Sequence, residues 1–217
     1  MLQKPIRSLQ CDIKLIAHCN SVCFPKSFST KLGQSFTEKT FEWFLSAENL
    51  FLFHIKDDTH VAGYCGGFIS RFNGDGSTSG MMQYAMKEAA FGMLKRPWLF
   101  FNKELLPFYP LVIKNISRNL FPGKTRNTKL APAIALNQRK TGLVVIGVHP
   151  DYRGKGIFEM LMNEFEKESS DKQISEMYLS VKKVNIRAVN AYKKVGWHVA
   201  KENQGSLEMA KSISKKI

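Results

Sequence analysis

The sequence predicts an α/β protein, and three observations carry this prediction. A short apolar, β-branched run at 143–148 (LVVIGV) is typical of a strand covered on both faces. Glycines follow it, and then apolar positions at three- and four-residue spacing predict an amphipathic helix from Ile157. A second run at 177–181 (MYLSV) precedes another segment with helix start and stop signals. Strands and helices that alternate in this way indicate a sheet flanked by helices.

The first seventy residues predict helices and then a hairpin. The apolar positions between Ile13 and Cys23, Leu15 among them, predict a helix that ends at Phe24-Pro25. A second helical stretch follows Thr37 and Thr40, with Phe41 and 43–45 packing inward.

Two strands are predicted next, at 50–55 and 61–70, separated by a polar turn at 56–59. Glycines at 63, 66 and 67 interrupt the second strand. We interpret them as a sign of loose packing, and the alternative is a bulge or a close backbone approach to a ligand.

Residues 71–140 predict a helical insertion between the third and fourth strands. The stretch 73–77 reads as a flexible entry, 81–96 as one helical run that Pro97 ends, and 98–106 and 111–121 as two further apolar segments.

The insertion is also strongly basic. From Gly80 to Lys140 eleven Lys or Arg face two carboxylates, so this region supplies nine of the chain's net +14 charges. Aromatic and basic residues broken into short helices are typical of an element that lies on an anionic lipid surface. The alternative is an extra helical layer on the sheet whose basic residues are solvated or line a wall for phosphates. Nucleic acid ranks lower, because the insertion has no recognisable nucleic-acid-binding module.

The segment 148–157 (VHPDYRGKGI) predicts a phosphate-binding loop. It joins a strand to a helix that opens at about 154–156, where unpaired amides and the positive end of the helix dipole favour an anion. Glycines allow close backbone approach, and Arg153 and Lys155 add positive charge.

The chain resembles the GNAT acyltransferase superfamily in two motifs that occur in the family's order. The first is an [Q/R]-x-x-G-x-[G/A] loop, here in the stretch 153–158, and the second is N-x-x-A-x-x-x-Y-x-x-x-G-[F/W], here from Asn185 to Trp197. The resemblance covers 141–210. It implies a mixed, mostly antiparallel sheet flanked by helices, and a single N-acetyltransferase domain over 1–217 with 71–140 as a basic, aromatic-rich helical insertion.

The resemblance also implies site residues and a co-substrate. Acetyl-CoA, or another acyl-CoA, would donate its acyl group to an amine of unknown identity by direct attack in a ternary complex, with no metal. Tyr192 matches the family tyrosine that protonates the departing thiolate. The expected cofactor-binding residues are Ile146, Gly147 and Val148 for the thioester carbonyl, Arg153, Gly154, Lys155, Gly156, Ile157 and Phe158 for the pyrophosphate, and Asn185 and Ala188 for the pantetheine arm.

Two points stay open in this site. Phe158 stands where the family prefers Gly or Ala, so its ring either crowds the pyrophosphate or turns into the core. No general base can be assigned: His149, Glu42, His54 and Glu48 are candidates, and a water chain or an amine that arrives neutral would need none. The alternative function is a non-catalytic CoA-binding or membrane-surface docking module.

Composition limits the remaining classes. Cys11, Cys19, Cys23 and Cys65 lack the spacing of a zinc site, so we expect buried, reduced thiols. The N-terminus has no signal-peptide core, and no run reaches the roughly 18 apolar residues that a spanning helix needs. A cytoplasmic protein, peripheral at the membrane if the insertion binds lipid, is therefore expected.

Overall fold

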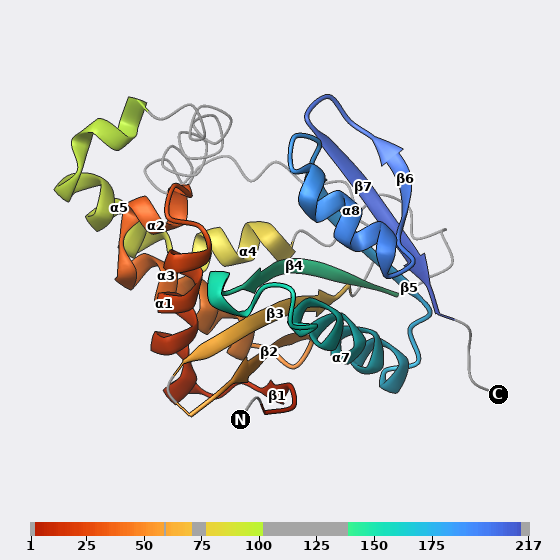
Figure 1. The fold of residues 1–217 in the computed structure, drawn as a ribbon. Coiled ribbons are helices and arrows are strands. Elements are labelled where there is room, and N and C mark those ends of the chain that lie inside the picture. The colour runs from red at the N-terminus through yellow and green to blue at the C-terminus, as the bar shows by residue number, and fades with distance from the viewer. Residues whose placement is uncertain (1–2, 59, 71–76, 102–138, 214–217) are drawn as a thin grey trace.

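The protein folds as a mixed sheet between two layers of helices. The computed structural model describes residues 3–58, 60–70, 77–101 and 139–213. Seven strands form one sheet in the order β1-β2-β3-β4-β5-β7-β6, and β4 with β5 is its parallel pair. The strands are β1 (Ile6–Arg7), β2 (Leu50–Lys56), β3 (Val61–Ile69), β4 (Lys140–Val148), β5 (Glu176–Lys182), β6 (His198–Glu202) and β7 (Ser206–Ser212). The predicted mixed, mostly antiparallel α/β fold is confirmed (Figure 1).

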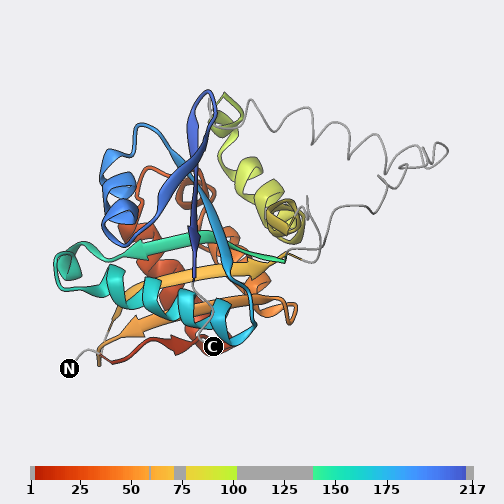
Figure 2. The same cartoon turned by 90° about the vertical axis from the view of Figure 1, so that its right-hand side faces the viewer.

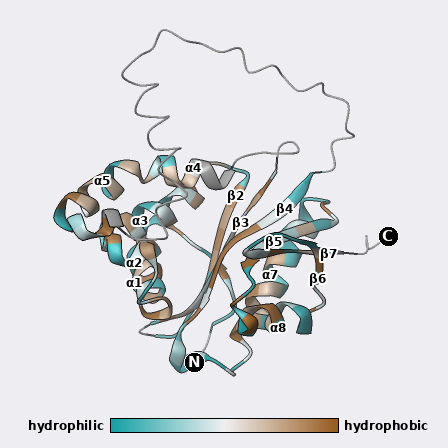
Figure 3. Cartoon of the chain, turned by 90° about the horizontal axis from the view of Figure 1, so that it is seen from above, coloured by the Kyte–Doolittle hydropathy of each residue, from teal (hydrophilic) through white to brown (hydrophobic). Residues whose placement is uncertain are grey.

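The helices divide between the two faces of the sheet, as Figure 3 shows from above. On one face lie α1 (Ile13–Cys23), α2 (Phe28–Leu32), α3 (Gln34–Glu42) and the 3-10 turn η2 (Trp43–Leu45). On the other face lie α7 (Ile157–Asp171) and α8 (Ile186–Lys194). Alternate side chains of β2 serve the two cores: Phe51 and Phe53 pack with α7, whereas Leu52 packs with α1. A strand buried on both faces explains the continuous apolar run at 50–55.

The glycines of β3 are tightly packed, so the interpretation of a loosely packed strand is wrong. A Cβ on Gly67 would lie 2.7 Å from the Gly142 carbonyl oxygen and 2.8 Å from the Phe165 ring. A Cβ on Gly63 would lie 2.7 Å from Ile157 Cγ2. The strand also carries a bulge between Gly66 and Gly67, in line with the alternative interpretation.

The N-terminal helices follow the prediction with local differences. The first helix ends at Cys23 as expected, but Leu45 is 36% exposed instead of packing inward. A short helix, α2, precedes α3 and was not predicted; Ser27 caps it by accepting a hydrogen bond from the Thr30 amide. Cys11 is exposed, so the expectation that all four thiols are buried is wrong for this residue.

The insertion begins with two helices instead of one. The predicted run at 81–96 is split into α4 (Ser77–Tyr84) and α5 (Met86–Lys95), because Ala85 leaves the helical conformation at φ −99° and ψ 15°. The 3-10 turn η3 (Pro97–Phe101) follows. Figure 2 shows α4 and α5 beside the sheet. The expected entry at 71–76 and the apolar segments from 102 to 121 lie outside the described residues. Among the residues described, no helix combines the length and apolarity that spanning a bilayer requires.

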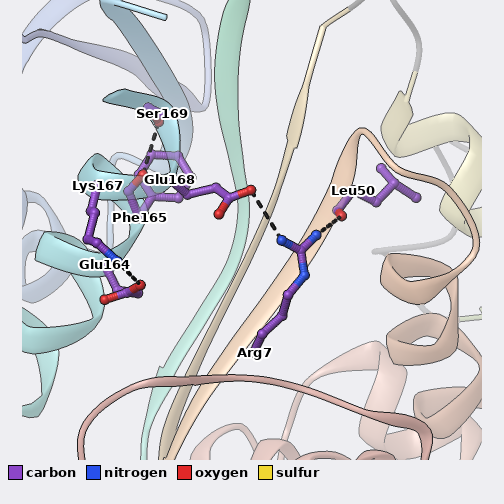
Figure 4. Close-up of polar contacts among 7 residues, drawn as sticks. All are labelled: Arg7, Leu50, Glu164, Phe165, Lys167, Glu168 and Ser169. Atoms are coloured by element: carbon purple, nitrogen blue, oxygen red, sulfur yellow. Dashed lines mark hydrogen bonds and ion pairs between the residues drawn. The ribbon is translucent and has the colours of Figure 1, made fainter. Parts of the chain in front are cut away.

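Arg7 ties the edge of the sheet to a helix. Its guanidinium donates to the Leu50 carbonyl on β2 at 3.2 Å and contacts the Glu168 carboxylate on α7 at 3.3 Å (Figure 4). The Arg7 side chain therefore links β1 to the neighbouring strand β2 and to the helix α7.

Candidate active site

A cleft opens where the two parallel strands separate. Pairing between β4 and β5 ends at Leu143 with Leu179, and beyond that point both strands line a cleft of about 900 Å³. The N-terminus of α7, one side of α8 and the end of α1 complete its walls.

Two backbone amides of β4 face this cleft. The His149 amide donates to the Ala62 carbonyl on β3 at 2.9 Å. Because backbone groups alternate sides along a strand, the amide of Gly147 also faces β3, and those of Ile146 and Val148 face the cleft. Gly147 has a steric role instead. A Cβ at this position would lie 2.5 Å from the Tyr64 hydroxyl, so only glycine leaves room for that ring.

The loop after β4 has the geometry of an anion site. Gly154 and Gly156 adopt φ of +78° and +77°, and nothing lies within 4 Å of the position that a Cβ would take on either. Gly156 is the N-cap of α7 and makes no side-chain cap hydrogen bond, so the first amides of the helix are not capped by that residue. Tyr152 anchors the loop, since its hydroxyl donates to the Asp57 carboxylate on the β2–β3 turn.

The two basic residues of the loop differ in position. Arg153 lines the cleft, and its Nε donates to the Val148 carbonyl at 3.3 Å. Lys155 is exposed and does not line the cleft; its Nζ lies 5.1 Å from the centroid of the Tyr152 ring. The two remaining predicted pyrophosphate residues, Ile157 and Phe158, both line the cleft.

Tyr192 lies on the inner side of α8 and lines the same cleft. The rings of Phe158 and Trp197 pack against it, with centroids at 5.5 Å and 6.1 Å. Phe158 thus turns into the core and supports the tyrosine. Burial, and to a lesser extent the nearby Cys65 thiol, raises the pKa of Tyr192 above its usual value, so its hydroxyl keeps its proton at neutral pH.

The start of α8 contributes the last two predicted residues. The side-chain oxygen of Asn185 accepts from the Ala188 amide at 3.3 Å and caps the helix, and both residues line the cleft. Of the predicted site residues, the structure therefore gathers all except Lys155 around one cleft.

The sequence did not indicate several lining residues. Asn20 on α1 accepts a hydrogen bond of 2.6 Å from the Tyr64 hydroxyl on β3, and both line the cleft. Forty-four positions separate them in the chain, and neither belongs to a motif. Basic residues beside the motifs also line it, namely Lys182, Arg187 and Lys194. The surplus of Lys and Arg around the second motif was the available signal for these three.

None of the four candidate bases lines the cleft. Glu42 pairs with Lys39 at 2.7 Å, and Glu48 borders a separate hollow beside β1. His54 is fully buried against Ser8, with its Nδ1 at 2.9 Å from the Ser8 hydroxyl. The His149 ring packs edge-on against Tyr152 and accepts from the Asp151 amide. Within the described part of the chain, no three His, Cys, Asp or Glu residues are grouped to hold a metal ion.

Comparisons with known proteins find a matching family and several similar solved structures. Residues 123–197 match the model of the acetyltransferase (GNAT) family. The ribosomal-protein-S18-alanine N-acetyltransferase of Escherichia coli has a similar structure, with a TM-score of 0.55, 15% identity, and 99% of this chain and 95% of that chain covered. The PaiA N-acetyltransferase of Thermoplasma acidophilum, solved with coenzyme A, has a TM-score of 0.55 and 13% identity, with 98% of this chain and 99% of that chain covered.

A third solved structure is yncA of Salmonella typhimurium, whose cofactor is acetyl-CoA, with a TM-score of 0.55, 11% identity, and 99% and 95% coverage. No curated protein matches the sequence. At these identities the likeness establishes the fold, and the family model covers the segment that carries both motifs. The resemblance found in the sequence is confirmed: the chain has the GNAT acetyltransferase fold, and its residues 123–197 match that family.

Proposed function

We propose that this protein transfers an acetyl group from acetyl-CoA to an amine, within a single N-acetyltransferase domain. The observation that carries the proposal is the meeting of three features in one cleft: the Gly154–Gly156 loop at the start of α7, the open amides of Ile146 and Val148, and the Tyr192 hydroxyl. An anion site, an oxyanion site and a proton donor are what thioester aminolysis requires.

The loop would bind the pyrophosphate of acetyl-CoA. Uncapped amides and the dipole at the start of α7 favour a negative group, and Arg153 adds a formal charge. The open Cβ positions of Gly154 and Gly156 leave space for it. Lys182, Arg187 and Lys194 add positive charge along the rest of the cleft.

The chemical step would be direct attack of the amine nitrogen on the thioester carbonyl. The carbonyl oxygen gains charge as the nitrogen–carbon bond forms, and the amides of Ile146 and Val148, which face the cleft, would stabilise it. When the carbon–sulfur bond breaks, Tyr192 would give its proton to the sulfur. The excess proton on the new amide nitrogen would then return to Tyr192, so the enzyme ends unchanged.

Release of free thiol from acetyl-CoA tests the proposal. With a panel of primary amines, we expect turnover that Tyr192→Phe lowers at least about 100-fold, because the ring packing survives and only the proton donor is lost. Tyr84→Phe removes an exposed hydroxyl outside the cleft and is the matched control, expected to keep full activity.

The alternative is a CoA-binding module without catalysis. It predicts that CoA raises the melting temperature although no amine in the panel is acetylated. If CoA fails to bind in calorimetry, the assignment of the cleft as an acyl-CoA site is wrong.

We also propose a second role, contact of the insertion with an anionic lipid surface. On α5 and η3, Phe91, Leu94 and Trp98 are 66%, 73% and 65% exposed, and Lys87 and Lys95 are exposed on the same helix. An outward face of large apolar and basic residues is typical of an interfacial helix. The competing interpretation is a helical layer that only packs, as the buried side of α5 does through Ala89.

Sedimentation with phosphatidylserine vesicles separates these interpretations. Binding at low salt that Leu94→Glu abolishes supports the lipid role, and Leu15→Glu on α1, where the leucine is 48% exposed, is the control outside the insertion. No sedimentation at low salt would leave only the packing role.

A further inference from the structure

The cleft is basic on one side and uncharged on the other. Arg153, Lys182, Arg187 and Lys194 belong to the loop, β5 and α8. The opposite wall comes from the end of α1, the segment that leads into α2, the first turn of α2, and β3. Its side chains carry no charge: Asn20, Phe24, Ser27, Ser29 and Tyr64. The basic side suits the phosphates of a nucleotide carrier, which leaves the uncharged side for the acceptor.

Carboxylates are scarce around this cleft. Of the described residues that line it, Glu159 is the one carboxylate, and Lys194 Nζ lies 3.4 Å from it. The parts of the chain outside the described residues contain Asp75 and Glu104 and no histidine. A protonated amine on the uncharged wall would therefore face the basic residues of β5 and α8, and Glu159 is the one carboxylate among the described residues that line the cleft.

This environment selects against ammonium ions. A positive charge that leaves water without a negative partner loses solvation energy, and nearby cations raise that cost. The attacking amine must in any case be neutral, because its lone pair forms the new bond. The site is thus suited to amines that are already neutral at physiological pH.

Asn20 adds a second feature to the acceptor wall. Its side-chain oxygen accepts from Tyr64, and within the described residues its side-chain nitrogen has no hydrogen-bond partner. That nitrogen can donate to an oxygen of the acceptor. A carbonyl next to the amine would place an acceptor oxygen within reach of Asn20 while the nitrogen faces the thioester.

We propose, building on the acetyl transfer proposed above, that the acceptor is an α-amino group next to a carbonyl, as in an amino acid amide or a peptide N-terminus. Such amines have pKa values of about 7.7–8.0, against about 10.4 for a lysine side chain, so their neutral fraction at pH 7 is roughly 300-fold larger. Asn20 holds the neighbouring carbonyl and acts as a specificity residue.

Lysinamide tests this choice within one molecule, because it carries both kinds of amine. After subtraction of the reaction without enzyme, mass spectrometry should find α-acetyl product in excess over ε-acetyl product by at least about tenfold at pH 7. Excess ε-acetyl product would overturn the inference and leave the acetyltransferase proposal intact. Absence of product with every amine would instead contradict the acetyltransferase proposal.

Asn20→Ala tests the carbonyl contact. With glycinamide as acceptor we expect KM to rise about tenfold, the equivalent of one hydrogen bond. With trifluoroethylamine, which is weakly basic but has no carbonyl, KM should not change. Asn163→Ala, an exposed asparagine of α7 outside the cleft, is the matched control. Equal losses with both acceptors would assign Asn20 a structural role and overturn the contact.

The pH profile gives a third readout. If the enzyme supplies no base, log kcat/KM should rise with unit slope and level off at the pKa of the acceptor itself. Exchanging glycinamide for trifluoroethylamine should therefore move the inflection to lower pH. An inflection that stays at one pH for both acceptors would reveal a base on the protein and contradict the inference.

Discussion

Gly154 and Gly156 are the residues whose backbone conformation the anion loop most depends on. Both lie at positive φ, and no atom lies within 4 Å of an added Cβ. Replacing either glycine with alanine would therefore destabilise the loop through backbone strain and not through a steric clash. The glycines of β3 differ, because a Cβ there would clash with neighbouring atoms.

Gly156→Ala should lower the free energy of unfolding by about 1 kcal/mol, the cost of a left-handed conformation for a residue with a Cβ. It should also weaken CoA binding, because the chain would relax away from the geometry that aims the amides. Gly205→Ala is the control: its Cβ would also meet nothing, and its φ is not positive. Urea unfolding and calorimetry with CoA measure the two effects. Equal results for the two variants would contradict the role given to the left-handed turn.

Single residues also mark the limit of what the sequence could predict. Both motifs are continuous along the chain, so the resemblance to the family could indicate the loop, Tyr192 and Asn185 as site residues. Asn20 and Tyr64 could not, because their contact depends on how α1 crosses β3, and neither residue type signals a site by itself. The side chain of Lys155 lies outside the cleft for a related reason: charge in a loop does not fix the direction of a flexible side chain, and here it turns to Tyr152.

At the scale of elements, strong periodicity was predicted better than short segments. The strands at 50–55 and 61–70 and the helix from Ile157 agree with β2, β3 and α7 because each buries a long apolar face. The two-residue β1 and the fully exposed β6 lack such a face, and pairing with their neighbours defines them instead. The glycines of β3 show the same limit, since only the positions of Phe165 and Gly142 explain why no side chain fits there.

Gly67→Ala should destabilise the sheet strongly. The added methyl would overlap a backbone oxygen and two rings, and overpacking of this kind costs about 1–3 kcal/mol. Urea unfolding of this variant beside Gly205→Ala measures the difference. An unchanged midpoint of urea unfolding would show that β3 is loosely packed, as its glycine content suggested.

His54 makes the junction of β1 and β2 sensitive to acid. Its ring is fully buried, with the Ser8 hydroxyl at Nδ1 and the Asp12 carboxylate 3.7 Å from Nε2. Burial lowers the pKa of His54, and the neighbouring Lys56 lowers it further, while Asp12 raises it in part. The folded state therefore binds the proton more weakly than the unfolded state does.

The sign of the pH effect follows from this difference. Stability from neutral His54 is fully present above the unfolded pKa, about 6.5, and is lost as the pH falls below it, at a slope of up to about 1.4 kcal/mol per pH unit. His54→Gln should flatten the fall in unfolding free energy between pH 7 and 5, and the exposed His198→Gln should leave it unchanged. Parallel curves for the wild type and His54→Gln would show that this histidine does not set the acid sensitivity.

At the scale of the whole molecule, the net charge of +14 favours anionic ligands, and the cleft concentrates part of it in Arg153, Lys182, Arg187 and Lys194. CoA carries its charge on phosphates, whereas pantetheine, which has the same thiol arm, carries none. Salt screens partly exposed charges, so raising KCl from about 50 to 500 mM should weaken CoA binding by about tenfold and leave pantetheine binding unchanged. Arg187→Ala should reduce this salt dependence, and Lys201→Ala, on β6 outside the cleft, should not. Isothermal calorimetry across the salt series measures both, and equal dependence for the two ligands would mean that the basic side of the cleft does not bind the phosphates.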